Sequence, residues 1–221
     1  MAQRNLLSIL LDAQAYLDLD ASTTPTGSDL TTRANYANQA VLEAASTNKF
    51  AAFNKTQIVS TSGGTQFATL ASVTLASNFR EFNTAPVTDL GGGIFQQYVQ
   101  IKPEDRYAKN VDDKYCYVLG NPSEGFTAVF NRLTANATLS IDYQRYPSGL
   151  LTLTDVCELP DDLYVVEKIK SYVLQSRTDE RFPIVEANAG RILVNMTGRE
   201  DRKPTGGVNT IPKLQRYRIG E

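Results

Sequence analysis

The spacing of apolar residues changes twice along this chain, and that change limits the folds available to it. Up to about residue 45, apolar residues recur every three or four positions, as on one face of an α-helix. From Lys55 they alternate with polar residues, which is typical of strands with one buried face. The helical spacing returns from Leu163 to Met196. The pattern predicts helices at both ends of the chain and a β region between them.

Two helices are expected before the β region. The apolar stripe of the first runs from Leu6 to Leu17, and the Pro and Gly of "DASTTPTGS" break the chain after it. Ser28 or Asp29 is placed to accept a hydrogen bond from the free amides of a second helix. The inner face of this helix is rich in Ala, which allows close approach of another helix. Its members are Leu30, Ala34, Ala37, Val41 and Ala44 or Ala45.

Several short β runs fill the middle of the chain. Ser62-Gly63-Gly64, between two alternating runs, is typical of a hairpin turn. The clearest runs are Tyr115–Leu119, Phe126–Leu133 and Thr138–Tyr146. Asn, Gly, Pro and Ser separate them, as in turns. This part of the sequence predicts an antiparallel meander.

A helical hairpin is expected after the meander. Asp161 or Asp162 follows Pro160 and can cap its first helix, and Pro183 suits the first turn of its second helix. The short turn "SRTDER" makes the two helices antiparallel neighbours, with Ile169 and Leu193 pointing inward. The N-terminal helices are the natural cover for the apolar face that these two helices share.

The fold predicted from these patterns is α+β. It is a helical bundle, formed by the N-terminal helices and the C-terminal αα-hairpin, with an inserted antiparallel β region and an extended C-terminal tail. The expected boundaries are 1–54 and 154–202 for the helical parts, 55–153 for the β region and 203–221 for the tail.

The composition argues against most enzyme classes. The 221 residues include no His, which excludes a Ser-His-Asp triad and any His-ligated metal. The two cysteines, Cys116 and Cys157, form no CxxC motif, so free thiols in a reducing cytosol are favoured over a disulfide between them. The adjacent acids of "PEDRY", "VDDKY" and "PDD" are interpreted as turn residues that face solvent, and "DLGGGIF" lacks the Lys-Ser/Thr of a phosphate loop. We therefore expect no catalytic residue, no metal and no cofactor.

Two features favour binding to other proteins. Tyrosines in the β runs suit strand packing, and the alternative is an interface; they are Tyr98, Tyr115, Tyr117, Tyr143 and Tyr146. The polar tail is either a disordered end or a segment that orders on a partner, and its apolar residues between basic ones favour the second interpretation. The candidate partner-binding residues are Arg202, Lys203, Ile211, Lys213, Leu214, Arg216, Tyr217 and Arg218.

The order of these elements resembles a known family. Two N-terminal helices lead to "YCYVLG…FTAVFN…LSIDYQRYP", then to "GLLTLTDVCELPDDL", an αα-hairpin with an "RFP" bend, and a polar tail. This arrangement resembles the head-to-tail adaptor (connector) proteins of tailed bacteriophages, in particular the tail-tubular adaptors of short-tailed phages. The most similar segment is residues 141–196.

The resemblance implies a structural protein of the virion, made in the host cytoplasm and located at the head–tail interface. It implies a homo-oligomeric ring, dodecameric in the family, with the C-terminal tail on the portal protein and the β region toward a tail tube or nozzle protein. DNA would pass through the lumen with only transient contact, which suits a formal net charge of −2. No membrane contact is expected, since no segment approaches the length of a membrane span.

Three alternatives stay open at this point. The first is another neck or tail-tube component. The second is a small carboxylate-dependent hydrolase, against which the missing His counts. The third is a nucleic-acid-binding module, which the balanced charge disfavours.

Overall fold

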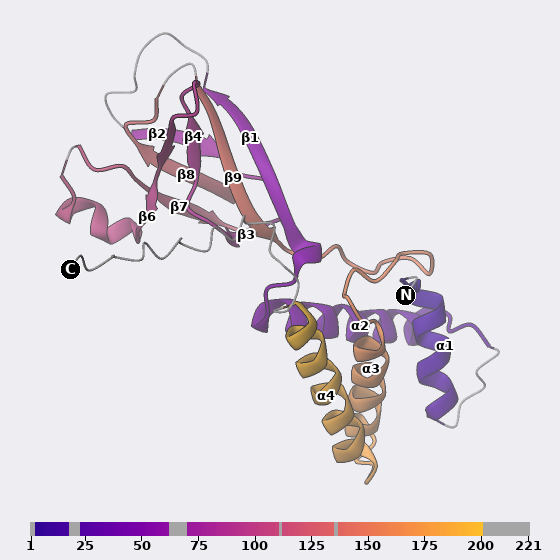
Figure 1. Ribbon diagram of the computed structural model, residues 1–221. Helices are drawn as coiled ribbons and strands as arrows, with labels where there is room; N and C mark the ends of the chain where they lie inside the picture. Colours follow the sequence, from indigo (N-terminus) through magenta and orange to yellow (C-terminus); the bar gives the residue numbers. More distant parts are fainter. Residues whose placement is uncertain (1–2, 18–22, 62–69, 111, 135–136, 201–221) are drawn as a thin grey trace, which may run out of the picture.

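The computed structural model describes residues 3–17, 23–61, 70–110, 112–134 and 137–200. Figure 1 shows a helical part and a β part side by side, connected where α2 leads into β1 and where β9 leads back toward α3. Segments from both ends of the sequence form the helical part, and the β part comes from the middle of the chain.

The helical part contains α1 (Leu6–Tyr16), α2 (Gly27–Thr47), α3 (Leu163–Ser176) and α4 (Phe182–Glu200). Asn5 caps α1, because its Oδ1 accepts a hydrogen bond from the Ser8 amide at 3.0 Å. The cap predicted for α2 was wrong: the helix begins at Gly27, before Ser28 and Asp29, and Gly27 has a φ of +57°.

α3 is the central helix of this part. It contacts α1, α2 and α4, and Figure 1 shows it between α1 and α4. The apolar stripes predicted from the sequence meet in one core, which includes Leu6, Leu10, Ala37 and Ile169. Ile169 is fully buried, whereas Leu193 is only partly buried at the edge of this core.

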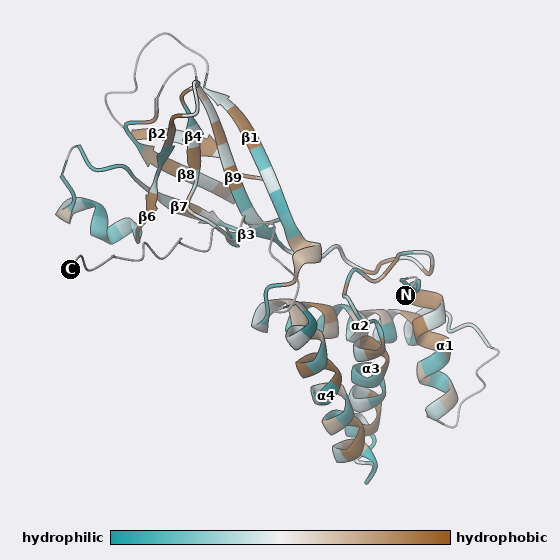
Figure 2. Ribbon diagram, in the orientation of Figure 1, coloured by the Kyte–Doolittle hydropathy of each residue, from teal (hydrophilic) through white to brown (hydrophobic). Residues whose placement is uncertain are grey.

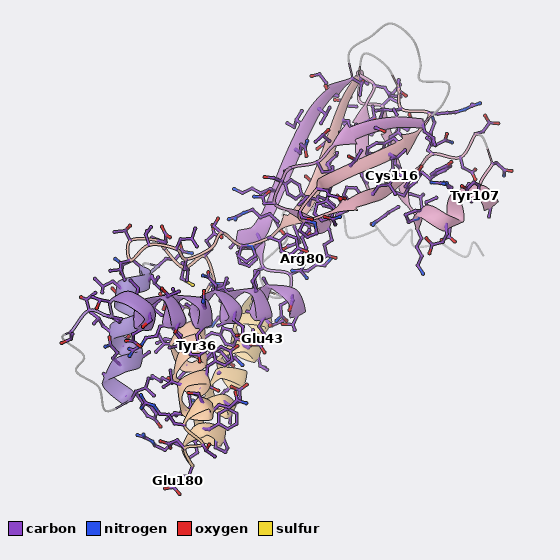
Figure 3. All side chains as sticks on the ribbon, turned by 180° about the vertical axis from the view of Figure 1, so that it is seen from behind. Tyr36, Glu43, Arg80, Tyr107, Cys116 and Glu180 are labelled. Carbon is purple, nitrogen blue, oxygen red and sulfur yellow. The ribbon has the colours of Figure 1, made fainter. Side chains whose placement is uncertain are left out.

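The predicted helical bundle is wrong. α2 does not align with the other helices but lies across them, as Figures 1 and 3 show. The Ala-rich face of α2 explains this arrangement, since small side chains at Ala37, Ala40 and Ala44 allow it to rest closely on the helices beneath. The extended tail of the prediction, residues 203–221, lies outside the described residues.

The β part consists of two sheets rather than one meander. The five-stranded sheet has the order β1-β9-β4-β5, with β3 also paired to β9, and the four-stranded sheet has the order β2-β8-β7-β6. The strands are β1 (Asn54–Thr61), β2 (Leu70–Thr74), β3 (Phe79–Phe82), β4 (Val87–Asp89), β5 (Phe95–Gln97), β6 (Val99–Gln100), β7 (Tyr115–Asn121), β8 (Gly125–Asn131) and β9 (Ala137–Arg145).

The expectation of a purely antiparallel β region was also wrong. β6 runs parallel to β7, whereas the other pairs within the described residues are antiparallel. The buried Tyr98 connects β5 to β6, so the chain passes here directly from the edge of one sheet to the edge of the other. Apolar side chains from both sheets, including Phe79, Phe130 and Ile141, form the core between them. The protein is thus an α+β fold in which two packed sheets form a part of their own.

Candidate interaction surfaces

A buried ion cluster holds three helices together. The Lys168 ammonium on α3 lies 3.1 Å from Glu43 Oε2 on α2 and 2.9 Å from Glu186 Oε1 on α4. Ser171 donates a hydrogen bond to Glu186 at 2.6 Å, and the Tyr172 hydroxyl donates one to Glu43 at 2.7 Å. Lys168 is almost fully buried, so its charge is stable there only because two carboxylates face it. The cluster therefore stabilises one relative placement of α2, α3 and α4.

The titration properties of this cluster follow from its contacts. Burial opposes the ionisation of Glu186, but the hydrogen bonds from Ser171 and Lys168 outweigh it, and the pKa of Glu186 lies below its ordinary value. Burial raises the pKa of the Tyr172 hydroxyl far above its ordinary value, and the hydrogen bond to Glu43 raises it further. Tyr36 packs against the Tyr172 ring with the centroids 5.3 Å apart, and Figure 3 shows Tyr36 and Glu43 on α2. At neutral pH Glu186 is therefore a charged acceptor, and the Tyr172 phenol is a neutral donor.

Arg80 on β3 connects the β part to the helical part. Its guanidinium donates to the last carbonyls of α2, to Ala45 O and, at 3.0 Å, to Ser46 O (Figure 3). A cation at the C-terminal end of a helix also interacts favourably with the helix dipole. Gln144 on β9 donates to Phe50 O at 3.3 Å, next to this contact. These bonds restrict the orientation of the two parts relative to each other.

The acidic turns singled out in the sequence have structural partners. The Asp162 carboxylate accepts hydrogen bonds from the Arg4 backbone amide at 3.0 Å and from Arg4 Nη2 at 2.8 Å. It thereby ties the N-terminus to the start of α3, and its side chain makes no capping bond to that helix. The other predicted cap, Asp161, accepts a hydrogen bond from the Leu163 amide at the first residue of α3, at 3.2 Å. Asp112 forms an ion pair with Arg132. Within the described ranges, no group of three or more Cys, Asp and Glu side chains is placed to hold a metal ion.

The two cysteines are free and buried. Burial raises the pKa of the Cys116 thiol to about 12 and that of the Cys157 thiol to about 11. Cys116 lies in β7 inside the β part, as Figure 3 shows. Both side chains are protonated at neutral pH, so neither is an activated nucleophile.

The tyrosines of the β runs serve mainly in packing, the interpretation that the sequence favoured. Tyr98, Tyr115, Tyr117 and Tyr143 are buried, and only Tyr146 is exposed, at 37%. Tyr115 and Tyr117 are two positions apart in β7, so they face the same side of the strand, where they pack with Val129.

The most exposed tyrosine among the described residues lies outside the β runs that the sequence predicted. Tyr107 is 81% exposed on the short 3₁₀ helix η2 (Pro103–Ala108), away from the helical part (Figure 3). The Arg106 guanidinium lies 4.6 Å from the centroid of the Tyr107 ring. A hollow of about 540 Å³ lies beside this helix, lined by Gln100, Ile101, Lys102, Asp105, Ala108 and Lys109. The segment "KPEDRYAK" gave a signal only through its Pro and charges, which are equally common in ordinary loops.

The partner-binding residues predicted in the tail, from Arg202 to Arg218, lie outside the described residues. The structure does show where the segment that contains them begins. Thr197 near the end of α4 donates a hydrogen bond to Asn48 Oδ1 at 3.1 Å, just after the end of α2. The described chain therefore ends close to the connection between the helical and β parts.

The ionic residues described above connect elements of the fold to one another. None of the described helices has the length and hydrophobicity required to cross a membrane. Residues 4–175 match the family model for the SU10 adaptor protein, so the chain belongs to this family. The match confirms the resemblance to phage head-to-tail adaptors, and the protein is a structural adaptor of a bacteriophage virion. No protein of curated function matches the chain.

Proposed function

We propose that copies of this chain form a closed ring, dodecameric as the resemblance implies, between the portal and the tail of the virion. The observation that carries the proposal is the family match across residues 4–175, which include the β part and the helical part up to α3. DNA passes through the lumen with only transient contact. A formal net charge of −2 supports this, because a strongly basic ring would retain the phosphate backbone.

The C-terminal segment 203–221 docks on the portal protein in this proposal. Its position supports the role, since the described chain ends beside the connection between the two parts, close to Asn48. Its residues support it too, because Arg and Tyr dominate many protein interfaces. The proposed contacts are Arg202, Lys203, Ile211, Lys213, Leu214, Arg216, Tyr217 and Arg218.

The β part faces a tail tube or nozzle protein in this proposal. Its separation from the helical part supports an adaptor with two working ends (Figure 1). Tyr107 is exposed beside a hollow, on the side of the β part away from the helices. Its ring offers contact area and its hydroxyl a polar group, as is common at protein interfaces.

The test compares the full chain with a variant that lacks residues 203–221, each mixed with purified portal rings and imaged by electron microscopy. We expect the full chain to form a ring beneath the portal. The truncated chain should keep its melting temperature within about 2 °C, since a change of 1 kcal/mol shifts it by about 2–4 °C, but should fail to bind. Normal binding by the truncated chain would contradict the docking role, and failure to fold would make the segment part of the core. Absence of any ring with the full chain would contradict the proposed function itself.

A further inference from the structure

α4 has apolar residues on its outer side as well as on its inner side. Its inner face, with Val185, Ala189 and Met196, is buried against the rest of the helical part. Its outer face, called here the α4 flank, contains Ile184, Ala187, Gly190, Arg191, Val194 and Gly198, all of which are exposed. Ile184 is 64% exposed and Val194 is 71% exposed, and Figure 2 shows hydrophobic colour along much of this helix. The outer side also carries the polar residues Arg191, Asn195 and Arg199. Ile184 and Val194 are nevertheless large apolar side chains that stay mostly exposed, and such positions mark a surface that a partner can cover.

Two glycines give a second, independent indication. Gly190 and Gly198 lie within α4, where each costs helix stability relative to Ala. A Cβ atom built at either position would meet no other atom within 4 Å. Nothing within the described chain therefore requires glycine there. Close approach by a backbone from outside explains both residues.

The opposite side of the helical part carries a matching helix. α3 lies between α1 and α4, so no other described helix packs on the outer side of α1 (Figure 1). This side, called here the α1 flank, presents Ser8, Leu11, Asp12 and Ala15. Leu17 and Val185 pack together against Leu174. Leu17 and Val185 thus lie at the same height along α3. Ala15 and Ala187 are each two residues further from that end of the helices, so they also lie at the same height.

The charges of the two flanks are complementary. Arg191 is exposed on the α4 flank and forms no ion pair with any residue that the structure describes. The α1 flank has Asp12, and Asp12 and Asp162 share the single guanidinium of Arg4. One negative charge is thus left uncompensated there. α1 runs parallel to α3 and α4 antiparallel to it, so copies related by rotation would pair the two flanks as antiparallel helices.

We infer that the α4 flank of one copy packs against the α1 flank of the next copy. The inference rests on the proposed function, and it names the surfaces that close the ring. Contacts between two different faces are heterologous, and they produce rings when the rotation closes. Small residues at Ala187, Gly190 and Gly198 let the α1 helix of the neighbour approach closely, while Ile184 and Val194 lose their exposure to water.

Cysteine cross-linking in assembled particles tests the pairing. The variant with Ala15→Cys and Ala187→Cys should give a ladder of disulfide-linked multimers on a non-reducing gel, because the two positions are level. Each single variant, and the Gln39→Cys control on the exposed face of α2, should stay monomeric. The native cysteines do not interfere, since both are buried.

Substitution of Gly190 separates assembly from folding. Gly190→Ala should raise the melting temperature of the isolated chain by about 2–4 °C through better helix propensity. Gly190→Gln should fold as well as the wild type but lower the yield of joined heads and tails at least tenfold, because its side chain keeps the neighbouring helix away.

Several outcomes would overturn the inference. Dimers from Ala187→Cys alone would show that two α4 flanks meet, and cross-links to the portal would show a different occupant. Protection of Ala187→Cys from a maleimide in the monomer, lost on deletion of residues 203–221, would show that the chain's own C-terminal segment covers the face. The pairing would be overturned, with the proposed function intact, if rings formed normally with Gly190→Gln and the double cysteine variant gave no ladder. Complete absence of rings with the wild type would instead contradict the proposed function.

Discussion

Replacement of Lys168 by Met tests whether the ion cluster holds the helices in place. Met keeps an unbranched apolar stem of similar length, so packing against the Tyr172 ring is largely retained. The ammonium, 4.9 Å from the centroid of that ring, is lost together with its contacts to Glu43 and Glu186. The two carboxylates then face each other without a cation between them.

The loss in the free energy of unfolding caused by Lys168→Met follows from the contacts that are lost and those that remain. The charge-assisted hydrogen bond to Glu186 contributes about 1.5–3 kcal/mol, and the ion pair with Glu43 adds to it. However, Glu43 keeps its donor Tyr172 and Glu186 keeps its donor Ser171. The two carboxylate side chains are also 47% and 42% exposed, so water can replace part of the loss. We expect a loss of about 2–3 kcal/mol, below the 3–5 kcal/mol typical of a fully buried pair. In a protein of this size the melting temperature should fall by about 4–12 °C.

Urea unfolding followed by circular dichroism measures the loss, with Lys49→Met as the control. Lys49 pairs with Glu81 at 3.1 Å, its side chain is 54% exposed, and such a surface pair contributes only about 0–1 kcal/mol. Glu186→Gln should cost less in the Lys168→Met background than in the wild type, because its carboxylate is then already unpaired. Equal losses for the two lysine variants, or a change below about 0.5 kcal/mol for Lys168→Met, within the range of ordinary surface substitutions, would refute this reasoning.

Two further predictions concern titration. Burial opposes ionisation of Asp162, but the hydrogen bonds from Arg4 outweigh it and hold its pKa below the ordinary value; this stabilisation is present above about pH 4, the pKa in the unfolded chain, and is lost as the pH falls through the folded pKa. Asp162→Asn should therefore lower the urea midpoint at pH 7 and reduce its fall between pH 5 and pH 3, and an unchanged acid slope would contradict the assignment. At pH 8 the thiols of Cys116 and Cys157 should react with Ellman's reagent at least on the order of a hundredfold more slowly than in urea, since raised pKa values leave little thiolate. Fast labelling of the folded protein would show that these sites are open.

The local elements could be predicted from the sequence because they depend on local geometry. The runs expected at 115–119, 126–133 and 138–146 correspond to β7, β8 and β9, with ends that differ by one or two residues. The helices around Leu10 and Ile169 likewise follow from apolar residues spaced three and four apart. Such periods record which side of an element is apolar, whatever that side later contacts.

The partners of those apolar sides could not be predicted, because they depend on segments that are far apart in the chain. β1 pairs with β9 in a register that runs from Asn54 opposite Gln144 to Thr61 opposite Ala137, and β6 runs parallel to β7; no local pattern specifies either pairing. The sequence predicted aligned helices, whereas contacts of the Ala-rich face with several helices at once place α2 across them.

For the candidate surfaces, too, some features could be predicted from the sequence and others only from the tertiary structure. Composition was enough to exclude histidine chemistry, and the resemblance was enough to indicate the adaptor family. In the sequence, however, "VEKIKSY" resembles an ordinary solvated helix face, and α4 resembles an ordinary amphipathic helix. Only the packed structure brings Glu43 and Glu186 to Lys168 and leaves Ile184 and Val194 uncovered. The burial of a side chain is determined by all the elements around it, and local spacing contains no record of them.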